Sequence, residues 1–225
     1  MNEVYVVDYL VHDCLGYDVA DNYVNMDKAT GPKRVTRYDP DLYPQVLTKN
    51  GYQLPNPDYT EKDNIGFKMA MELADTMGKR YELAKDTAMI VGSFGLGSSV
   101  KDDFLQAFNN HQRRFSPTKL FMANHDLLSA TLANKLKLEG LSTSLHAACS
   151  SSMFNLYLAW LMIRNGETGS ALVGGVDSPL WPAFQYHWQC TGAISTKEGG
   201  ICIPFDKRRD GFLQGEGGTL WYICD

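Results

Sequence analysis

The segment from Ser142 to Val176 constrains the fold most strongly, because it predicts a buried helix between two strands. Strand-forming residues run from Ser142 to Ala148 and from Ala171 to Val173. Ser150–Asn165 lies between them and predicts a helix that ends at Gly166. Apolar residues cover nearly every side of this helix, which indicates a central helix packed between layers. They are Met153, Phe154, Leu156, Leu158, Trp160, Leu161 and Ile163.

The rest of the chain also alternates strands and helices. Val4–Val7 predicts a first strand, and the stretch Asp18–Asn64 is rich in prolines and predicts few long elements. Apolar residues at helical spacing in Asp63–Met77 predict an amphipathic helix. This order predicts a layered α/β fold with a mostly parallel sheet. The other predicted elements are a strand at Ala88–Val91, helices at Val100–Asn109 and Leu127–Leu138, and a strand at Thr219–Ile223.

The composition is that of a folded globular chain. Of its 225 residues, 44% are hydrophobic and 12% are aromatic, which excludes intrinsic disorder. Lys and Arg total 21 against 26 Asp and Glu, so the formal net charge is −5. This sign argues against a nucleic-acid partner, because phosphates attract basic proteins.

The apolar stretches predict a cytoplasmic protein with no membrane partner. Met1–Leu10 contains Glu3 and Asp8 and lacks the basic start and apolar centre of a secretory signal. The longest charge-free apolar stretch in a helical pattern, Met153–Ile163, is shorter than the roughly 18 residues that span a bilayer. The five cysteines include no CxxC pair, so we expect neither a disulfide framework nor a zinc site.

Cys149 is the candidate nucleophile. It follows the predicted strand directly, and Ser150–Ser152 then opens the central helix with hydroxyl groups that suit a helix N-terminus. The helix dipole favours a thiolate at this position, and the backbone N–H of Cys149 could point at an oxyanion on an attached acyl group. Topology alone leaves open the commoner role of a cysteine as a small buried apolar side chain.

Several motifs in this region together resemble the β-ketoacyl synthase family, the condensing enzymes of fatty-acid and polyketide synthesis. Their order and spacing match the family across Phe121 to Asp225, and weaker matches lie upstream at Arg34–Pro40, Asp63–Met77 and Gly92–Ser98. The motifs are Ala148–Ser152, Gly166–Glu167, Leu172–Val176, Gly192–Ser195, Pro204–Phe212 and Gly215–Gly218.

The resemblance implies a thiolase-like fold, in which two similar α/β halves pack together. Residues 1–225 then form the N-terminal half, a mixed five-stranded sheet with helices on both faces, and the C-terminal half is absent from this chain. In the family, the cysteine at the position of Cys149 accepts an acyl chain from acyl carrier protein as a thioester. Decarboxylation of a malonyl unit then drives a Claisen condensation. The resemblance implies no metal or redox cofactor, because the substrates arrive on phosphopantetheine arms.

The family's two catalytic histidine motifs are absent from this chain. The family uses two histidines and a lysine from its C-terminal half. We expect His146 to be structural, because an odd offset from Cys149 on a strand points it away from the thiol. We expect His187 to pack among aromatic residues in a loop at Ala183–Thr191. The full set of histidines is His12, His111, His125, His146 and His187.

Three explanations for the missing half stay open. The chain is a short subunit that borrows the rest of its site, a fragment of a longer enzyme, or a non-catalytic subunit similar to a chain-length factor. In each case we expect another chain to cover the apolar face of the central helix. In the family, the strand before the nucleophile pairs across a two-fold axis. Thr143–Ala148 is therefore predicted to form a homodimer or a heterodimer with a ketosynthase-like chain.

Four further features have simpler interpretations. Gly92–Ser98 follows a strand but lacks the order of a nucleotide-binding loop, so we expect a close-packed turn near the active site. By the resemblance, Pro204–Asp210 holds partly buried ion pairs, and Glu216 is structural. The basic pairs Lys79–Arg80 and Arg113–Arg114 could steer an acidic carrier protein, although solvated surface is the default interpretation.

Overall fold

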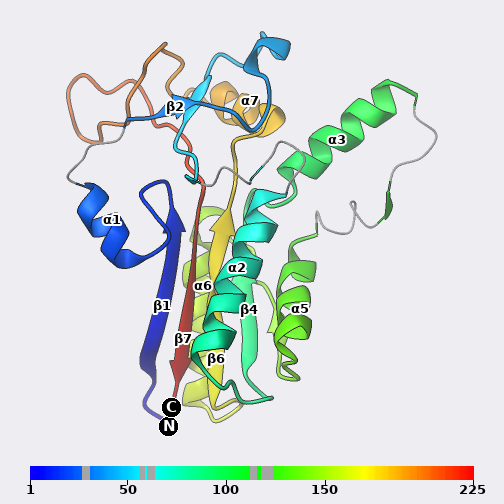
Figure 1. Cartoon of the computed structure of the whole chain (residues 1–225), viewed down its shortest axis with the longest axis vertical. Helices are drawn as coiled ribbons and strands as arrows, with labels where there is room; N and C mark the ends of the chain where they lie inside the picture. Colours follow the sequence, from blue (N-terminus) through cyan, green and yellow to red (C-terminus); the bar gives the residue numbers. More distant parts are fainter. Residues whose placement is uncertain (27–30, 56–58, 60–63, 112–115, 118–123) are drawn as a thin grey trace.

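A five-stranded mixed sheet with helices on both faces forms the body of the protein (Figure 1), as the sequence predicts. The computed structural model describes the chain except residues 27–30, 56–58, 60–63, 112–115 and 118–123. The strand order is β1-β7-β6-β4-β5. Four strands run in one direction and β7 runs against them, since it is antiparallel to both neighbours. The strands are β1 (Tyr5–Asp13), β4 (Ala88–Gly92), β5 (Ser142–Thr143), β6 (Ser170–Asp177) and β7 (Gly217–Cys224).

Helices α2 and α5 cover one face of the sheet, and α6 covers the other (Figure 1). Successive side chains of β4 point to opposite faces of the sheet. Met89 and Val91 face α2 and α5, whereas Ala88 and Ile90 face α6. The described helices are α1 (Val19–Met26), α2 (Ile65–Arg80), α3 (Ser98–Asn109), α5 (His125–Leu136), α6 (Ser151–Arg164) and α7 (Pro182–Cys190). A small second sheet pairs β2 (Lys33–Arg34) with β3 (Asn50–Gly51).

The predicted stripe of α2 is confirmed as its buried face. Ile65, Met69, Leu73 and Met77 are all inaccessible to solvent or nearly so. Asn64 begins the helix, because its side chain accepts a hydrogen bond from the N–H of Phe67 at 3.1 Å. The predicted start at Asp63 lies outside the described residues.

Helix α6 packs on the sheet with one side only. Its buried residues include Asn155, Ala159 and Ile163, whereas Met153 and Tyr157 on the opposite side are 68% and 55% exposed. Gly166 ends the helix at φ +75°, a conformation that suits glycine, and its N–H bonds the carbonyl oxygen of Ile163. The second layer expected over α6 is therefore not supplied by this chain's described residues.

Two local predictions are wrong. The strand predicted over Ser142–Ala148 pairs with β4 only at Ser142 and Thr143, because the following backbone turns toward α6. The loop predicted over Ala183–Thr191 is instead the helix α7, which Pro182 begins at its first position, where a missing N–H costs nothing. The first strand is also longer than Val4–Val7, since β1 pairs with β7 as far as Asp13.

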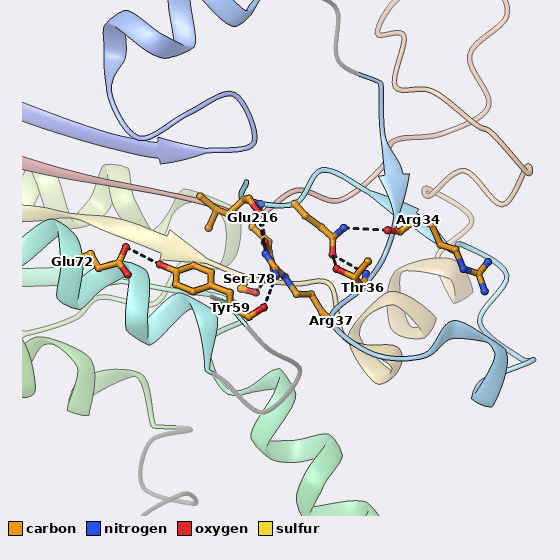
Figure 2. A network of polar contacts seen from close by, with 9 residues as sticks. Arg34, Thr36, Arg37, Tyr59, Glu72, Ser178 and Glu216 are labelled. Atoms are coloured by element: carbon orange, nitrogen blue, oxygen red, sulfur yellow. Dashed lines mark hydrogen bonds and ion pairs between the residues drawn. The ribbon is translucent and has the colours of Figure 1, made fainter. Parts of the chain in front are cut away.

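A buried ion pair joins the segment around β2 and β3 to the end of the main sheet (Figure 2). The guanidinium of Arg37 donates to both carboxylate oxygens of Glu216, at 2.9 and 2.6 Å. Glu216 also accepts from the N–H of Leu54 and the hydroxyl of Ser178, and Arg37 also donates to the carbonyl oxygens of Leu54 and Tyr59. Each charged group thus makes four hydrogen bonds, which offset the cost of burying the pair. This agrees with the structural role expected for Glu216.

Loss of Arg37 should strongly destabilise the protein. In Arg37→Met, the carboxylate of Glu216 stays buried without its counter-charge, and we expect the free energy of unfolding to fall by about 3–5 kcal/mol. Arg34→Met is the matched control, because Arg34 pairs with an exposed Asp41 and such pairs contribute about 0–1 kcal/mol. Urea unfolding of both variants measures the difference. Equal losses in the two variants would contradict a special role for the buried pair.

The stability of the fold should also depend on His12. Burial lowers the pKa of the His12 imidazole below its ordinary value of 6.5, although the Asp13 carboxylate acts in the opposite direction. Glu72 lies 3.9 Å from its Nδ1, too far for a hydrogen bond. The unfolded chain therefore takes up a proton below pH 6.5 that the folded chain resists, and stability falls as the pH drops through that range.

We expect His12→Phe to weaken this acid sensitivity. The variant removes the titrating imidazole but keeps an aromatic ring against Tyr17, which packs edge-on to His12. Urea unfolding at neutral pH and at mildly acidic pH measures the change in each protein. An identical loss of stability on acidification in both proteins would show that His12 is not responsible.

Candidate active site

The candidate site lies where the parallel strands β4, β5 and β6 end and α6 begins. In layered α/β folds, the carboxyl ends of parallel strands are the usual position of ligand sites. Cys149 sits here in a one-turn 3₁₀ helix, Ala148–Ser150, directly before α6. Its residue is exposed, so it is not the small buried apolar side chain that topology alone left open.

The turn that carries Cys149 is closed by its own hydrogen bonds. The carbonyl oxygen of Ala147 accepts from the N–H and the hydroxyl of Ser150, at 3.1 and 2.7 Å. The hydroxyl of Ser151 donates to the carbonyl oxygen of Ala148 at 2.7 Å and accepts from the N–H of Ala147 at 3.0 Å. The N–H of Cys149 takes no part in these bonds.

Ala148 adopts a strained backbone conformation. Its φ is +50°, in the left-handed region that costs a residue with a Cβ about 1–2 kcal/mol. Such strain persists only where the surrounding structure imposes it, and it concentrates at functional sites. The strain at Ala148 therefore supports a functional role for the turn that presents Cys149.

Two glycines let the first turn of α6 approach the strand ends closely. A Cβ on Gly92, at the end of β4, would lie 2.5 Å from Nδ2 of Asn155 and 3.2 Å from Cβ of Ser151. A Cβ on Gly175 would lie 2.0 Å from the hydroxyl oxygen of Ser152. Gly175 of the Val173-Gly174-Gly175 motif is thus required at this site, because any side chain there would collide with Ser152.

The loop after β4 is the close-packed turn that the sequence predicts. Asp177, at the end of β6, accepts hydrogen bonds from the hydroxyl of Ser93 and the N–H groups of Phe94 and Gly95. A carboxylate of the chain therefore already occupies the donors that a phosphate-binding loop would offer. The sequence did not predict this role of Asp177, whose only distinguishing feature there was its place after a predicted strand.

The two histidines singled out in the sequence, His146 and His187, lie in different parts of the structure. His146 is exposed in the irregular segment 144–147, so the argument from strand alternation does not apply to it. His187 lies on α7 and packs against Phe184 and Trp188, which agrees with the expected packing role. Phe94 also contacts Phe184 and Trp188, so an aromatic cluster links α7 to the loop after β4.

The charged loop at Pro204–Asp210 differs in part from the prediction. Arg208 pairs with Asp206 at 2.9 Å and lowers the pKa of that carboxyl, but the Arg208 side chain is 81% exposed. The expected partial burial therefore holds for Asp206, whose side chain is 33% exposed, but not for Arg208. Asp210 is less accessible and accepts from the hydroxyl of Ser195 at 2.9 Å.

Of the two basic pairs, Lys79–Arg80 lies at the end of α2, where Arg80 pairs with Asp8 at 3.0 Å. The pair Arg113–Arg114 lies outside the described residues. Within the described ranges, every helix is too short or too polar to span a bilayer. The same residues form no group of three or more His, Cys, Asp or Glu side chains that could hold a metal ion.

Known proteins similar to this chain include polyketide synthases and a 3-oxoacyl-[acyl-carrier-protein] synthase. A highly reducing polyketide synthase of Aspergillus fumigatus is 28% identical over 162 residues, which are 72% of this chain and 6% of that protein. The chloroplastic 3-oxoacyl-[acyl-carrier-protein] synthase I of Arabidopsis thaliana is 30% identical over 159 residues, 68% of this chain and 34% of that protein. The chain thus spans about a third or less of these relatives.

Solved ketosynthase structures share the fold. A type II polyketide synthase acyl carrier protein in complex with its ketosynthase bound to the hexaketide gives a TM-score of 0.82 at 15% identity, covering 99% of this chain and 58% of the other. A ketosynthase in complex with its chain length factor from Xenorhabdus doucetiae gives 0.77 at 20% identity, covering 98% and 57%.

A family model agrees with both sets of similar proteins. The model for the β-ketoacyl synthase N-terminal domain matches residues 67–221, well over half of the chain and the whole of the candidate site. The chain belongs to the β-ketoacyl synthase family.

Proposed function

We propose that this chain is the N-terminal half of a ketosynthase-type condensing protein of the cytoplasm, with Cys149 as its acyl acceptor. The observation that carries the proposal is the position of Cys149, which is exposed on a strained turn at the start of α6. Family membership supplies the reaction class, because ketosynthases act in fatty-acid and polyketide synthesis.

The first half-reaction is a thioester exchange. The Cys149 thiolate attacks the carbonyl carbon of an acyl group carried on the phosphopantetheine thiol of an acyl carrier protein. The bond from that carbon to the carrier sulfur breaks, the carrier thiol leaves with a proton, and the acyl group remains on Cys149. In this proposal, the N–H of Cys149 donates a hydrogen bond to the oxyanion that forms on the way.

The second half-reaction extends the chain. A malonyl unit on a carrier loses CO₂, and the resulting carbanion attacks the thioester at Cys149. The cysteine leaves as a thiolate, and a β-ketoacyl product two carbons longer remains on the carrier. In the family, histidines of the C-terminal half stabilise the enolate, so condensation by this chain needs groups from outside its 225 residues. No metal or redox cofactor enters either step.

The exposed apolar face of α6 supports the proposal that a second chain packs against it. Met153, Phe154 and Tyr157 are each about half exposed or more, and together they form an apolar surface opposite the sheet. β5 is the edge strand of the sheet, and no described strand pairs with its outer side, where we propose that Thr143–Ala148 pairs with a partner. We therefore propose a homodimer or a heterodimer with a ketosynthase-like chain, together with an acyl carrier protein as donor.

A second candidate is a pocket-shaping subunit with no turnover of its own. The lack of the family's histidine motifs favours it, and a structurally similar ketosynthase was solved with its chain length factor. The retained, exposed Cys149 favours the enzymatic function instead. Acylation of the thiol distinguishes the two.

Acyl transfer to Cys149 should be directly observable. The protein, alone and with candidate partner chains, is incubated with acyl carrier protein bearing a labelled acyl chain. We expect intact mass spectrometry to show one adduct that is absent from Cys149→Ala, because the thioester forms at that sulfur. Cys190→Ala is the matched control, since Cys190 is also exposed but lies at the end of α7. No adduct with any partner would favour the pocket-shaping subunit.

Association should depend on the apolar face of α6. Phe154→Glu places a charge in a surface that we expect to be covered, so it should weaken assembly at least tenfold. Tyr23→Glu is the control, because Tyr23 is exposed on α1 and not on that face. Sedimentation velocity over a concentration series measures the assembly. Equal association of both variants would contradict the proposal that another chain packs on this face of α6.

A further inference from the structure

The segment 144–147, which leads from β5 into the Cys149 turn, is held by side chains of α6 instead of a neighbouring strand. Its N–H groups at Leu145 and Ala147 donate to Oδ1 of Asn155, at 2.7 Å, and to the hydroxyl oxygen of Ser151, at 3.0 Å. Alternate N–H groups of an extended chain point to the same side, where a strand would normally accept them. Two α6 side chains thus replace the missing ladder.

Asn155 and Ser151 are well placed to act together. They are four residues apart, so they lie on the same face of α6, and they are 0% and 4% exposed. Gly92 provides the room, because a Cβ at that position would meet Asn155 and Ser151 at once. Since Leu145 supplies an N–H donor, the amide group of Asn155 must present its oxygen to it.

The presence of a buried amide at Asn155 is not explained by its contribution to the stability of the fold alone. A buried amide group in an otherwise apolar helix is costly unless it is hydrogen-bonded. Nδ2 of Asn155 is buried and has no hydrogen-bond partner among the described residues. The one bond that Asn155 makes through its side chain in the described structure therefore goes to the segment before Cys149.

We propose that Asn155 and Ser151 are positioning residues that fix the Cys149 thiol through the backbone of residues 144–148. Ser151 also bonds the carbonyl oxygen of Ala148, both through its hydroxyl and through its N–H, and so helps impose the positive φ of that residue. Without these bonds the turn relaxes and the thiol loses its orientation. The inference rests on the proposed function of Cys149 as acyl acceptor.

Two pairs of variants test the proposal. Asn155→Leu removes the acceptor at similar volume, whereas Asn155→Asp keeps an acceptor oxygen and puts a second carboxyl oxygen in place of the unpaired Nδ2. Because the position is fully buried, we expect this carboxyl to stay protonated and neutral. Ser151→Ala removes the second acceptor, and Ser152→Ala removes the neighbouring hydroxyl, which makes no hydrogen bond to residues 144–148 in the described structure. Each is made in the full chain, with any partner chain that supports acyl transfer, and circular dichroism melting checks the fold.

Two rates are measured for each variant. They are acyl transfer from acyl carrier protein to Cys149, resolved into kcat and KM, and alkylation of Cys149 by iodoacetamide across neutral and alkaline pH. We expect Asn155→Leu and Ser151→Ala to lower kcat about tenfold or more with little change in KM, because small misplacements of a reacting group have effects of this size. Alkylation slows in the same variants. Asn155→Asp and Ser152→Ala stay close to the unmodified protein.

The outcomes separate the inference from the proposed function. If the unmodified protein accepts no acyl group but alkylation still slows in Asn155→Leu and Ser151→Ala, the proposed function fails and the positioning role stands. If the unmodified protein is acylated and both variants match it in both rates, the positioning role is overturned. If Asn155→Leu does not fold, Ser151→Ala against Ser152→Ala decides the question in the same way.

Discussion

The close approach of α6 to the ends of β4 and β6 is the contact on which the rest of the site depends. Gly92 and Gly175 leave no side chain between the sheet and the first turn of the helix. The helix can therefore place Ser151 and Asn155 against the backbone that precedes Cys149. A bulkier residue at either glycine would push the helix outward and separate these partners. The position of Cys149 is thus set by backbone packing first and by hydrogen bonds second.

The sequence predicts the sheet, the helices that pack on it and the place of Cys149 before α6 well, because all of these depend on local patterns. The apolar run of α6, the stripe of α2 and the glycine at 166 each carry a periodic or steric signal. The buried pair of Arg37 and Glu216 joins residues 179 positions apart, and the sequence around Arg37 does not predict its partner. Long-range pairing of this kind depends on tertiary structure.

Two errors in the prediction have the same cause. The segment after Thr143 has a strand-like composition, but its N–H groups are accepted by α6, so the ladder stops. The segment after Pro182 is rich in aromatic residues and looks irregular, but it packs as α7 against Phe94. In both cases a neighbouring element decides the local conformation. Asn155, a buried polar residue in an apolar helix, was the sequence signal for the first of these contacts.

The uncovered apolar side of α6 bears on how the chain behaves by itself in solution. Attraction between apolar surfaces in water weakens on cooling, because it is largely entropic near room temperature. We therefore expect any association of chains through the exposed Met153 and Tyr157 to be weaker in the cold than at body temperature. Producing the chain by itself at reduced temperature, or together with the chain that covers this face, therefore favours a soluble product.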